Sequence, residues 1–479
     1  VAQFSTGILA HFSISIYSTQ PCFRLWIFSL TDESVRKGME NLKPDSCYDS
    51  LFLAADSRNK ADWILGINAS YAMCKATGLG NNSLGRVQTP VLAAISRRYR
   101  ERENHISSDS WPIYISLQKD GILFKMRRTQ DLPDKESATM FFQDCKLAHQ
   151  AQITGISHSV KEILPPDLLD LTQLQKEANI RYGFTASEMY NIAQSLYEKK
   201  LISYPRTSSR YLTEDVFDSL SPIMARLLSW ELFPATKGTG GIDISGLSRH
   251  VISAEKANVH HAIIITGIRP GNLSEKEMQV YRLVAGRMLE TFMAPCRIET
   301  TNVEAVCAAQ HFKAEQTRII EAGWHDVFMR SDMVPKSGYS VNELPEVEKS
   351  DTLNVCGCNM VHKKQLPVNP FTDAELVEYM EQNGLGTVSS RTNIIRTLVN
   401  RKYIRYSGKY IVPTPKGMFT NETIRGKKIA DTSLTADWEK QLAGLESGMI
   451  TGQDFLNRIR TLAKEMTDDI FNTYSTKEE

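Results

Sequence analysis

Two stretches with strand-like alternation lie far apart in the 479-residue chain, with a long helical segment between them. Between about residues 111 and 162 the hydrophobic period changes to two: Ile113, Ile115 and Leu117 alternate with other residues, and Asp120 with Gly121 forms a turn signal typical of a hairpin. The same period of two returns in residues 298–321. Two β blocks around a helical insert favour one sheet-rich module that is interrupted by another domain.

The insert itself and the C-terminal part of the chain have the helical period. Residues 171–182 predict one helix, and Thr185 with Glu188 forms a capping box for a second. The order of helix, short extended segment and helix resembles a winged-helix arrangement. After residue 365 the chain predicts two more helices and a small hairpin over residues 403–412.

Composition excludes few function classes. The chain is 42% hydrophobic and 23% charged, which is ordinary for a globular protein, and its length predicts roughly three domains. Its net charge of +1 indicates that any nucleic-acid surface must be local. The eight scattered cysteines favour reduced thiols over zinc binding, and no run is apolar and long enough for a membrane helix.

The segment KLISYPRTSSRYL, residues 200–212, is the strongest candidate for chemistry. Pro205 disfavours the α region for Tyr204, and in an extended segment Tyr204 and Arg206 point to the same side. A guanidinium favours the phenolate of a group whose pKa is otherwise about 10, and it also binds phosphate. The pair therefore suits attack on a phosphodiester through a phosphotyrosine intermediate. A buried tyrosine beside a surface arginine is the alternative.

Two pairs of polar residues near the start of the chain are candidate nucleic-acid contacts. Arg58 and Asp62 lie four residues apart on the helix predicted within residues 51–72, so they share a face. Arg86 and Gln88 follow a turn glycine that permits close backbone approach. The alternative for the first pair is a surface ion pair, and for the second an ordinary polar turn.

Two later motifs add further candidates. His260 and His261 precede an apolar run; on an extended chain at most one of them faces a given site, and a satisfied core histidine is the alternative. Thr387, Ser389 and Arg391 stand at the start of a predicted helix after a glycine-rich turn, an arrangement that suits a phosphate backbone. A plain helical hairpin is the alternative there.

Taken in order, these motifs resemble those of type IA DNA topoisomerases, most closely the bacterial topoisomerase III branch. The matching stretches are residues 83–90 (SLGRVQTP), 200–212, 260–264 (HHAII) and 384–387 (GLGT). The resemblance extends from about residue 24 to the end of the chain. It implies a multidomain α+β fold with a toroidal core, helical and winged-helix-like domains and a two-part β arch.

The resemblance also implies domain boundaries. Residues 24–65 are similar to the segment just after the family's metal domain; within them the residue pattern predicts a strand over residues 24–30 and Thr31 as the cap of the next helix. The expected division is a remnant or unrelated start (1–23), the two parts of a helical base domain (24–107 and 366–479), the two parts of the β arch (108–165 and 291–365), and a helical domain with the tyrosine (166–290).

Catalytic roles follow from the resemblance, residue by residue. Tyr204 matches the nucleophile that cuts one strand and keeps the 5′ phosphate, and Arg206 matches the arginine that stabilises the transition state. His260 matches a histidine near the scissile phosphate. Arg58 and Asp62 match the pair that contacts the nucleotide at the cut.

The remaining expected DNA contacts are Arg86, Gln88, Lys200 and the helix-start residues Thr387, Ser389 and Arg391. In the family, the opened ring passes a strand and recloses, which relaxes or decatenates DNA. No ATP is expected, because the phosphotyrosine conserves the energy of the broken bond.

The start of the chain departs from the family pattern. The family's Mg²⁺ domain carries an acidic Asp-x-Asp-x-Glu cluster and an earlier Glu, whereas here no acidic residue precedes Asp32 and the chain opens without Met. Ser208 stands where the family usually has Asp. Mg²⁺ is thus expected for the family while its ligands are missing here, no metal-ligating residue is assigned, and we expect an N-terminally truncated or decayed member.

Two other functions compete with a working topoisomerase. One is a catalytically impaired remnant that binds single-stranded DNA without turnover. The other is a tyrosine recombinase, which is disfavoured because that class attaches the 3′ phosphate and has its nucleophile near the C-terminus, whereas Tyr204 is mid-chain. The expected partner is DNA, in single-stranded segments of a duplex, with no membrane; the protein is expected to be a monomer in the bacterial cytoplasm, associated with the nucleoid.

Overall fold

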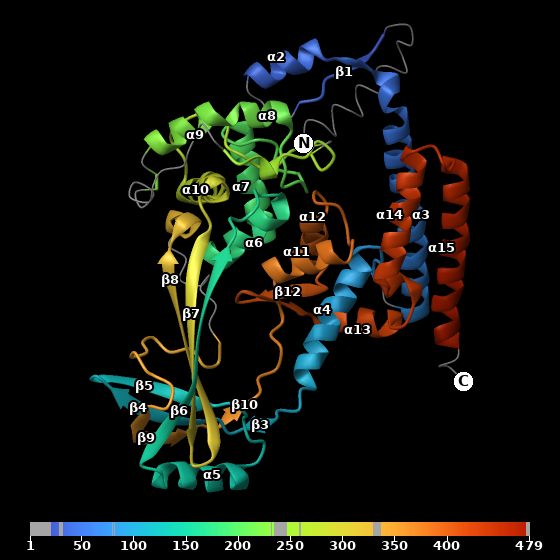
Figure 1. The fold of residues 1–479 in the computed structure, drawn as a ribbon. Helices are drawn as coiled ribbons and strands as arrows, with labels where there is room; N and C mark the ends of the chain where they lie inside the picture. The colour runs from blue at the N-terminus through green and yellow to red at the C-terminus, as the bar shows by residue number, and fades with distance from the viewer. Residues whose placement is uncertain are drawn as a thin grey trace. The chain divides into compact units, whose positions relative to one another are not determined.

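The computed structural model describes residues 21–27, 32–78, 80, 82–230, 232–233, 247–257, 260–328 and 337–475. The chain divides into two compact units, each assembled from segments that are distant in the sequence (Figure 1). The first unit takes Val1–Arg97, Leu171–Ser208 and Phe371–Glu479, and the second takes Arg98–Asp170 and Ser209–Pro370. Each unit is described by itself.

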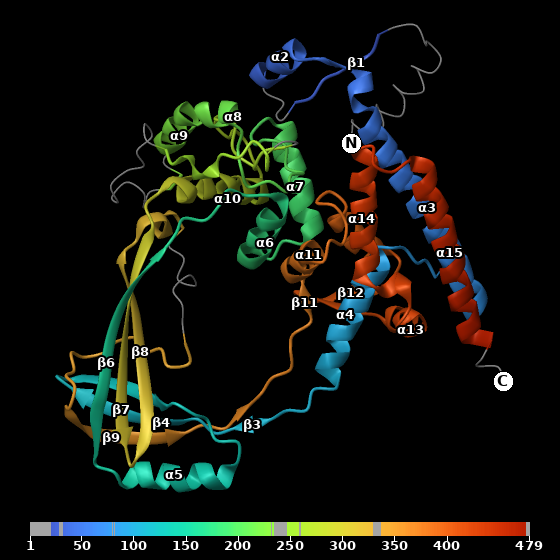
Figure 2. The ribbon, with the colours of Figure 1, turned by 45° about the vertical axis from the view of Figure 1, so that its right-hand side comes forward.

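The second unit is organised around a closed barrel (Figure 2). Its strands in the described residues are β4 (Ile113–Lys119), β5 (Ile122–Arg128), β6 (Gln150–Ile163), β7 (Cys296–Cys307), β8 (Gln310–Glu321) and β9 (Thr352–Met360). They follow the order β4-β5-β8-β7-β6-β9, and every neighbouring pair is antiparallel. Because β6 pairs with β7 along most of its length, the two β blocks share one sheet. The prediction that the two β blocks form one sheet-rich module is confirmed, whereas the insert as a separate domain stays a prediction.

Local sequence explains the first hairpin of this barrel. Asp120 and Gly121 both have positive φ, 50° and 81°, as a two-residue turn matched to the strand twist requires. Ile113, Ile115 and Leu117 alternate inward and are fully buried. They pack against Phe312 and neighbouring apolar residues of the barrel core.

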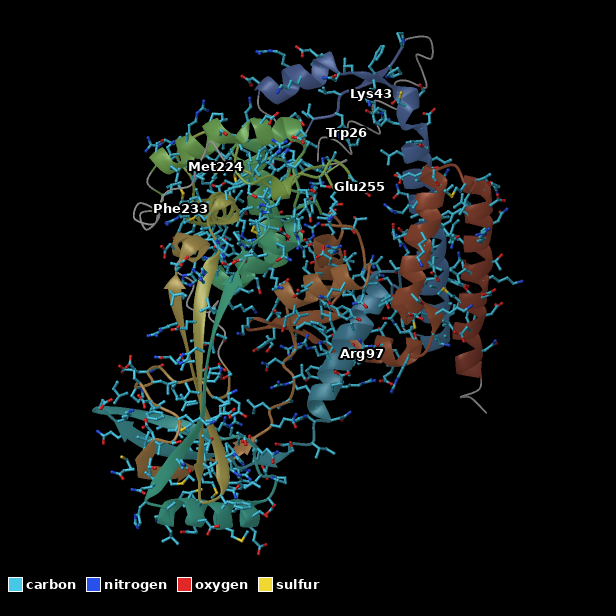
Figure 3. The ribbon with its side chains drawn as sticks, viewed as in Figure 1. Trp26, Lys43, Arg97, Met224, Phe233 and Glu255 are labelled. Atoms are coloured by element: carbon cyan, nitrogen blue, oxygen red, sulfur yellow. The ribbon has the colours of Figure 1, made fainter. Side chains whose placement is uncertain are left out.

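The other elements of the second unit lie outside the barrel. They are β3 (Asp109–Ser110), which pairs with β10 (Lys363–Lys364), and the helices α5 (Lys135–Leu147), α8 (Glu214–Asp218), α9 (Leu220–Ser229) and α10 (Glu275–Phe292), with short 3₁₀ turns at Arg249–Val251 and Gly323–Val327. Figure 3 labels Met224, which is buried on α9, and Phe233. Phe233 stacks edge-on against Phe328, and both rings fill the space over Gly286 of α10.

The first unit is mainly helical in its described part. Its helices are α2 (Asp32–Glu40), α3 (Asp49–Thr77), α4 (Gln88–Glu103, which continues into the second unit), α6 (Leu171–Tyr182), α7 (Ala186–Glu198), α11 (Asp373–Gln382), α12 (Arg391–Asn400), α13 (Pro415–Ile424), α14 (Thr432–Glu446) and α15 (Gly452–Ser475), with 3₁₀ turns at Asp45–Tyr48 and Lys428–Ala430. Its short strands are β1 (Phe23–Arg24), β2 (Lys43–Pro44), β11 (Phe371–Thr372), β12 (Ile404–Ser407) and β13 (Tyr410–Pro413).

Two apolar clusters hold the first unit together. One joins α3, α14 and α15 around Leu65, Trp438 and Phe455. The other joins α4, α11, α12 and the β12–β13 hairpin around Ile95 and Met380. The helices and hairpin predicted after residue 365 are therefore confirmed, while the predicted domain boundaries stay a prediction.

The predicted strand over residues 24–30 is wrong in its described part. Only Phe23 and Arg24 form a strand, because their partner β2 is itself two residues long. Residues 25–27 have no regular structure. Residues 28–30 and the predicted cap Thr31 lie outside the described residues, as does most of the opening segment 1–23.

A buried carboxylate joins three elements of the first unit. Asp373 is 3% exposed, and its Oδ1 accepts hydrogen bonds from the Ala186 amide (3.4 Å) and from the Tyr406 hydroxyl (3.1 Å). It thereby links the starts of α11 and α7 to β12. Burial raises the pKa of Asp373 to about 6, against the lowering effect of these two hydrogen bonds.

The Asp373→Asn variant should remove a pH dependence from the first unit. The folded pKa lies above the ordinary value of 3.8, so the stabilisation is complete below about pH 4 and is lost as the pH rises through about 6. The difference corresponds to roughly 3 kcal/mol at most. Thermal unfolding at pH 4.5 and 7 should show the wild type losing stability relative to Asp373→Asn. Parallel pH profiles of the two proteins would contradict this account.

Candidate active site

The end of α7 sets the direction of the tyrosine segment. A capping box of Thr185 and Glu188 fixes the start of the helix. At its other end Lys200 adopts a positive φ of 62°, and the amides of Lys200 and Leu201 bond back to the carbonyls of Tyr197 and Leu196. These bonds satisfy the last carbonyls of the helix and turn the chain sharply out of it.

The segment after this turn is anchored on both sides of Tyr204. Leu201 and Ile202 before it are buried, as is Thr207 after it. The Thr207 carbonyl accepts a hydrogen bond from the Leu171 amide at the start of α6 (3.0 Å). Tyr204 itself is half-buried, so its ring is held while part of it stays accessible.

Arg206 packs against α7, the helix that precedes it in the chain. Its Nη2 donates to Oε1 of Gln194 (3.4 Å), and its Cζ lies 5.0 Å from the centre of the Tyr190 ring. A hydrogen bond also connects Arg206 with Tyr204. The two side chains thus meet, as their spacing in an extended segment predicts.

Burial and the charge of Arg206 act in opposite directions on the pKa of the Tyr204 hydroxyl. Burial has the larger effect and raises the pKa of Tyr204 above its ordinary value of 10, while the charge and hydrogen bond of Arg206 lower it and the nearby Tyr190 raises it. The sequence predicted the effect of Arg206 but not that burial would outweigh it. At neutral pH the phenol is therefore protonated.

The two adjacent histidines belong to the second unit. Burial, followed by the charge of His261, lowers the pKa of His260 to about 4. His261 is 6% exposed, contacts the Ala262 carbonyl through Nδ1 (2.6 Å), and also has a pKa lowered by burial. Both rings are neutral at pH 7, so His260 offers a hydrogen bond rather than a positive charge. Asn258 and Val259 just before them lie outside the described residues.

Arg58 and Asp62 do not pair with each other. Arg58 pairs with Glu439 of α14, and Asp62 pairs with Nε of Arg86 (2.7 Å). Arg86 also binds Glu439 (3.0 Å) and lies 4.7 Å from the ring of Trp438. The result is a four-residue network across α3, α14 and the turn before α4.

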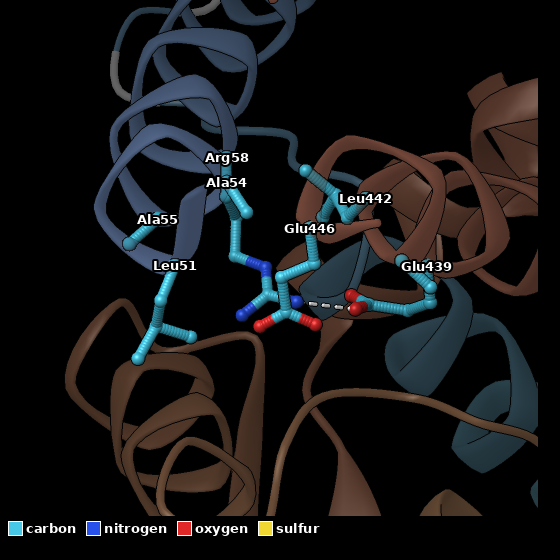
Figure 4. A pocket seen from close by; sticks show the side chains of 8 residues that line it. Leu51, Ala54, Ala55, Arg58, Glu439, Leu442 and Glu446 are labelled. Carbon is cyan, nitrogen blue, oxygen red and sulfur yellow. Dashed lines mark hydrogen bonds and ion pairs between the residues drawn. The ribbon is translucent and has the colours of Figure 1, made fainter. Parts of the chain in front are cut away.

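Arg86 is the buried centre of this network. Only 5% of its side chain is exposed, and two carboxylates and an aromatic face surround its guanidinium. Arg58 in contrast is about one third exposed and, with Glu439 and Glu446, lines a cavity of about 180 Å³ between α3 and α14 (Figure 4). Of the two arginines, Arg58 is the one that a ligand can reach.

The glycine-rich turn before α12 presents hydroxyl groups. Gly384 and Gly386 both have positive φ, 62° and 77°. Thr387 is exposed, its hydroxyl lies 3.2 Å from that of Ser389, and its amide donates to Ser390 Oγ. This geometry leaves polar groups at the start of the helix, as the sequence predicted.

Three predicted DNA contacts are already engaged within the first unit. Arg391 is 7% exposed and donates to Thr172 (2.9 Å) and Glu381 (3.2 Å). Gln88 accepts from Arg401 (2.8 Å). Lys200 forms an exposed ion pair with Asp32 (2.9 Å), and this partner lowers the pKa of Asp32.

Comparison with known proteins places this arrangement in a family. A family model described as DNA topoisomerase matches residues 46–457. The chain belongs to the DNA topoisomerase family. Within it the chain is a type IA, topoisomerase III-like member, as the sequence motifs predicted.

Two bacterial topoisomerases illustrate the relationship. DNA topoisomerase 3 of Bacillus licheniformis is 31% identical over 94% of this chain, and that of Bacillus subtilis is 30% identical over 95%. The alignments cover 65% and 66% of those two proteins, so the chain spans just under two thirds of the curated topoisomerases that it matches.

A solved topoisomerase shares the fold. Topoisomerase I from Thermotoga maritima superposes with a TM-score of 0.73 at 22% identity, over 94% of this chain and 73% of that one. The predicted multidomain α+β fold is therefore confirmed.

Mg²⁺, which membership of the topoisomerase family implies, finds no matching donor set in the described residues. No three His, Cys, Asp or Glu side chains there are grouped to hold a metal ion. The described residues therefore do not fit the ion. None of the helices in the described ranges combines the length and apolar character that a membrane crossing needs.

Sequence reasoning missed the residues that surround this topoisomerase's tyrosine and arginines. Tyr190, Gln194 and Tyr197 recur at helical spacing along α7, so a projection of the predicted helix would have shown them on one strip, though not that this strip faces Tyr204. Glu439 and Trp438 carry no local signal, because they are about 350 residues away from Arg86.

The Arg86→Met variant should lose more stability than Arg58→Met. Removing the buried guanidinium leaves Asp62 and Glu439 without their shared partner, at a cost of roughly 2 kcal/mol or more. Arg58 is more exposed and should cost about 1 kcal/mol or less. Denaturant unfolding followed by the fluorescence of the six tryptophans, which include the buried Trp438, measures both. Equal losses would show that Arg86 is not the centre of the network.

Proposed function

We propose that this chain cuts and reseals one DNA strand through Tyr204, as a type IA DNA topoisomerase. The observation that carries the proposal is the meeting of the Tyr204 phenol with the Arg206 guanidinium beside α7. Family membership supports the same reaction class. Both groups come from one segment of one chain, so a monomer suffices.

The proposed chemistry exchanges one phosphate ester for another. The Tyr204 oxygen attacks a phosphorus of single-stranded DNA and loses its proton, while the bond from phosphorus to the 3′ oxygen breaks. The 5′ phosphate stays on Tyr204, and the 3′ oxygen leaves as a hydroxyl after it takes up a proton. Resealing is the reverse attack of that hydroxyl. Each step replaces one ester bond with one other, so ATP is not required.

Arg206 serves the transition state in this scheme. Negative charge grows on the phosphoryl oxygens during attack, and a guanidinium can donate two parallel hydrogen bonds to them. Nε of Arg206 is buried and has no hydrogen-bond partner among the described residues, so a donor remains for a phosphoryl oxygen. His260, neutral at pH 7, would contribute a hydrogen bond near the phosphate.

The other predicted DNA contacts divide into two groups in this proposal. Arg58 at its cavity and the hydroxyls of Thr387 and Ser389 contact the strand directly, because they are accessible. Asp62, Arg86, Gln88, Lys200 and Arg391 have partners in their own unit and act by holding that surface in place. Relaxation or decatenation of DNA in a bacterial cell, on the nucleoid, belongs to the proposal because the relatives are bacterial topoisomerases.

Trapping with a labelled oligonucleotide tests the proposal. Incubation with single-stranded DNA and quenching in detergent should give a covalent adduct that retains a label on the 3′ side of the cut. Tyr204→Phe should abolish the adduct, and Arg206→Ala should slow it about 10²-fold or more, the scale of losing one transition-state donor.

The matched control is Tyr71→Phe, because Tyr71 is 59% exposed on α3, whereas Tyr204 lies in the segment after α7. It should leave the adduct unchanged. Tight binding without any adduct in the wild-type chain would reject the proposal and leave a single-strand-binding protein without turnover.

A further inference from the structure

One side of α7 carries three residues that approach the reactive pair. Tyr190, Gln194 and Tyr197 recur at i, i+4 and i+7, so they lie along one strip of the helix. The Tyr197 ring meets the Tyr204 ring edge-on, with centres 5.4 Å apart. Gln194 and Tyr190 both contact Arg206. The helix therefore contacts both groups of the proposed reaction.

Arg206 needs such support because its own backbone gives it little. Residues 205–210 contain no helix or strand, and an arginine side chain has many rotamers. The centre of the Tyr190 ring lies 5.0 Å from Cζ of Arg206, a cation–π contact that restrains the guanidinium without using its hydrogen-bond donors. Gln194 then contacts one of those edge donors, Nη2.

The Gln194 amide is itself oriented by a neighbour. Its Nε2 donates to Oε1 of Glu198 one turn later (2.8 Å), which turns Oε1 towards Arg206. The Gln194–Arg206 bond is long, at 3.4 Å, and its acceptor is neutral. A phosphate oxygen forms a stronger, charge-assisted bond with a guanidinium and would replace it.

We propose that Tyr190 and Gln194 are positioning residues for strand cleavage. Tyr190 fixes the orientation of the Arg206 guanidinium. Gln194, oriented by Glu198, accepts the hydrogen bond of Nη2 until a phosphoryl oxygen replaces it. The neighbouring Nε, which has no hydrogen-bond partner among the described residues, can then donate to the phosphate as well. The inference rests on the proposed function of Tyr204. It adds two residues that act on the reaction only through Arg206.

The packing of α7 separates this role from a structural one. The helix buries Met189, Ala193 and Leu196, whereas Tyr190 and Gln194 lie beside that strip and are only half-buried. Replacing either should leave the fold intact. Asn191, exposed on the same helix, provides the matched control as Asn191→Ala.

The first measurement is the rate of adduct formation as a function of pH in Tyr190→Leu and Gln194→Met. Both variants should form the adduct more slowly than the wild type, Tyr190→Leu by about 10-fold or more. The pH profile of Gln194→Met should move to higher pH, because a displaced Arg206 lowers the pKa of Tyr204 less. In Tyr190→Leu the loss of Tyr190, which itself raises this pKa, acts in the opposite direction, so its test in this measurement is the rate alone. Tyr190→Phe, which keeps the ring face, should recover most of the rate lost in Tyr190→Leu.

The second measurement needs no cleavage. In a Tyr204→Phe background, the slope of log binding constant against log salt reports the phosphate contacts of a single-stranded oligonucleotide. Arg206→Ala should make the slope shallower by about 0.7, the value for one phosphate contact. Tyr190→Leu should make it shallower by up to the same amount. Asn191→Ala should leave both the slope and the cleavage rate at their reference values.

The outcomes distinguish this inference from the proposed function. If Arg206→Ala changes rate and slope but Tyr190→Leu and Gln194→Met change neither, the positioning role is overturned and the function stands. If the wild-type chain forms no adduct, the proposed function fails, and the slopes then test only whether Tyr190 positions Arg206 for binding phosphate. Equal slopes for Tyr190→Leu and its Tyr204→Phe parent would overturn it in that case.

Discussion

The contact between the Arg206 guanidinium and the Tyr204 phenol is the interaction on which the site depends. Burial alone would keep the phenol protonated and unreactive, and Arg206 is the group that opposes burial. The same guanidinium has an unpartnered Nε and one weak neutral acceptor at Nη2, so it can also receive a phosphate. In the proposed reaction, one side chain thus links activation of the nucleophile to recognition of the group attacked.

The first unit holds this contact through packing between segments that are distant in the sequence. The sharp turn at Lys200 and the bond from Leu171 to Thr207 fix the two ends of the tyrosine segment. Asp373 ties the start of α7 to α11 and the hairpin of residues 404–413. α7, whose strip contacts both reactive groups, is therefore restrained at its start by the C-terminal part of the chain.

Local patterns predicted the features that depend on local physics. The period of two and the Asp120–Gly121 turn indicated that the two β blocks form one sheet-rich module, though not that it closes into a barrel, and the capping box of Thr185 and Glu188 marked the start of α7. The partners of Arg86 could not be predicted, because Glu439 is 353 residues away. The direction of the Tyr204 pKa also escaped prediction, since burial is a property of the tertiary fold.

Mass spectrometry of the trapped complex is the most direct test of the central claim. After reaction with a single-stranded oligonucleotide and digestion by protease and nuclease, a nucleotide attached through its 5′ phosphate should remain on the peptide that contains Tyr204. The account predicts that this peptide is the site of attachment. A nucleotide attached to another residue, or to Tyr204 through a 3′ phosphate, would contradict it.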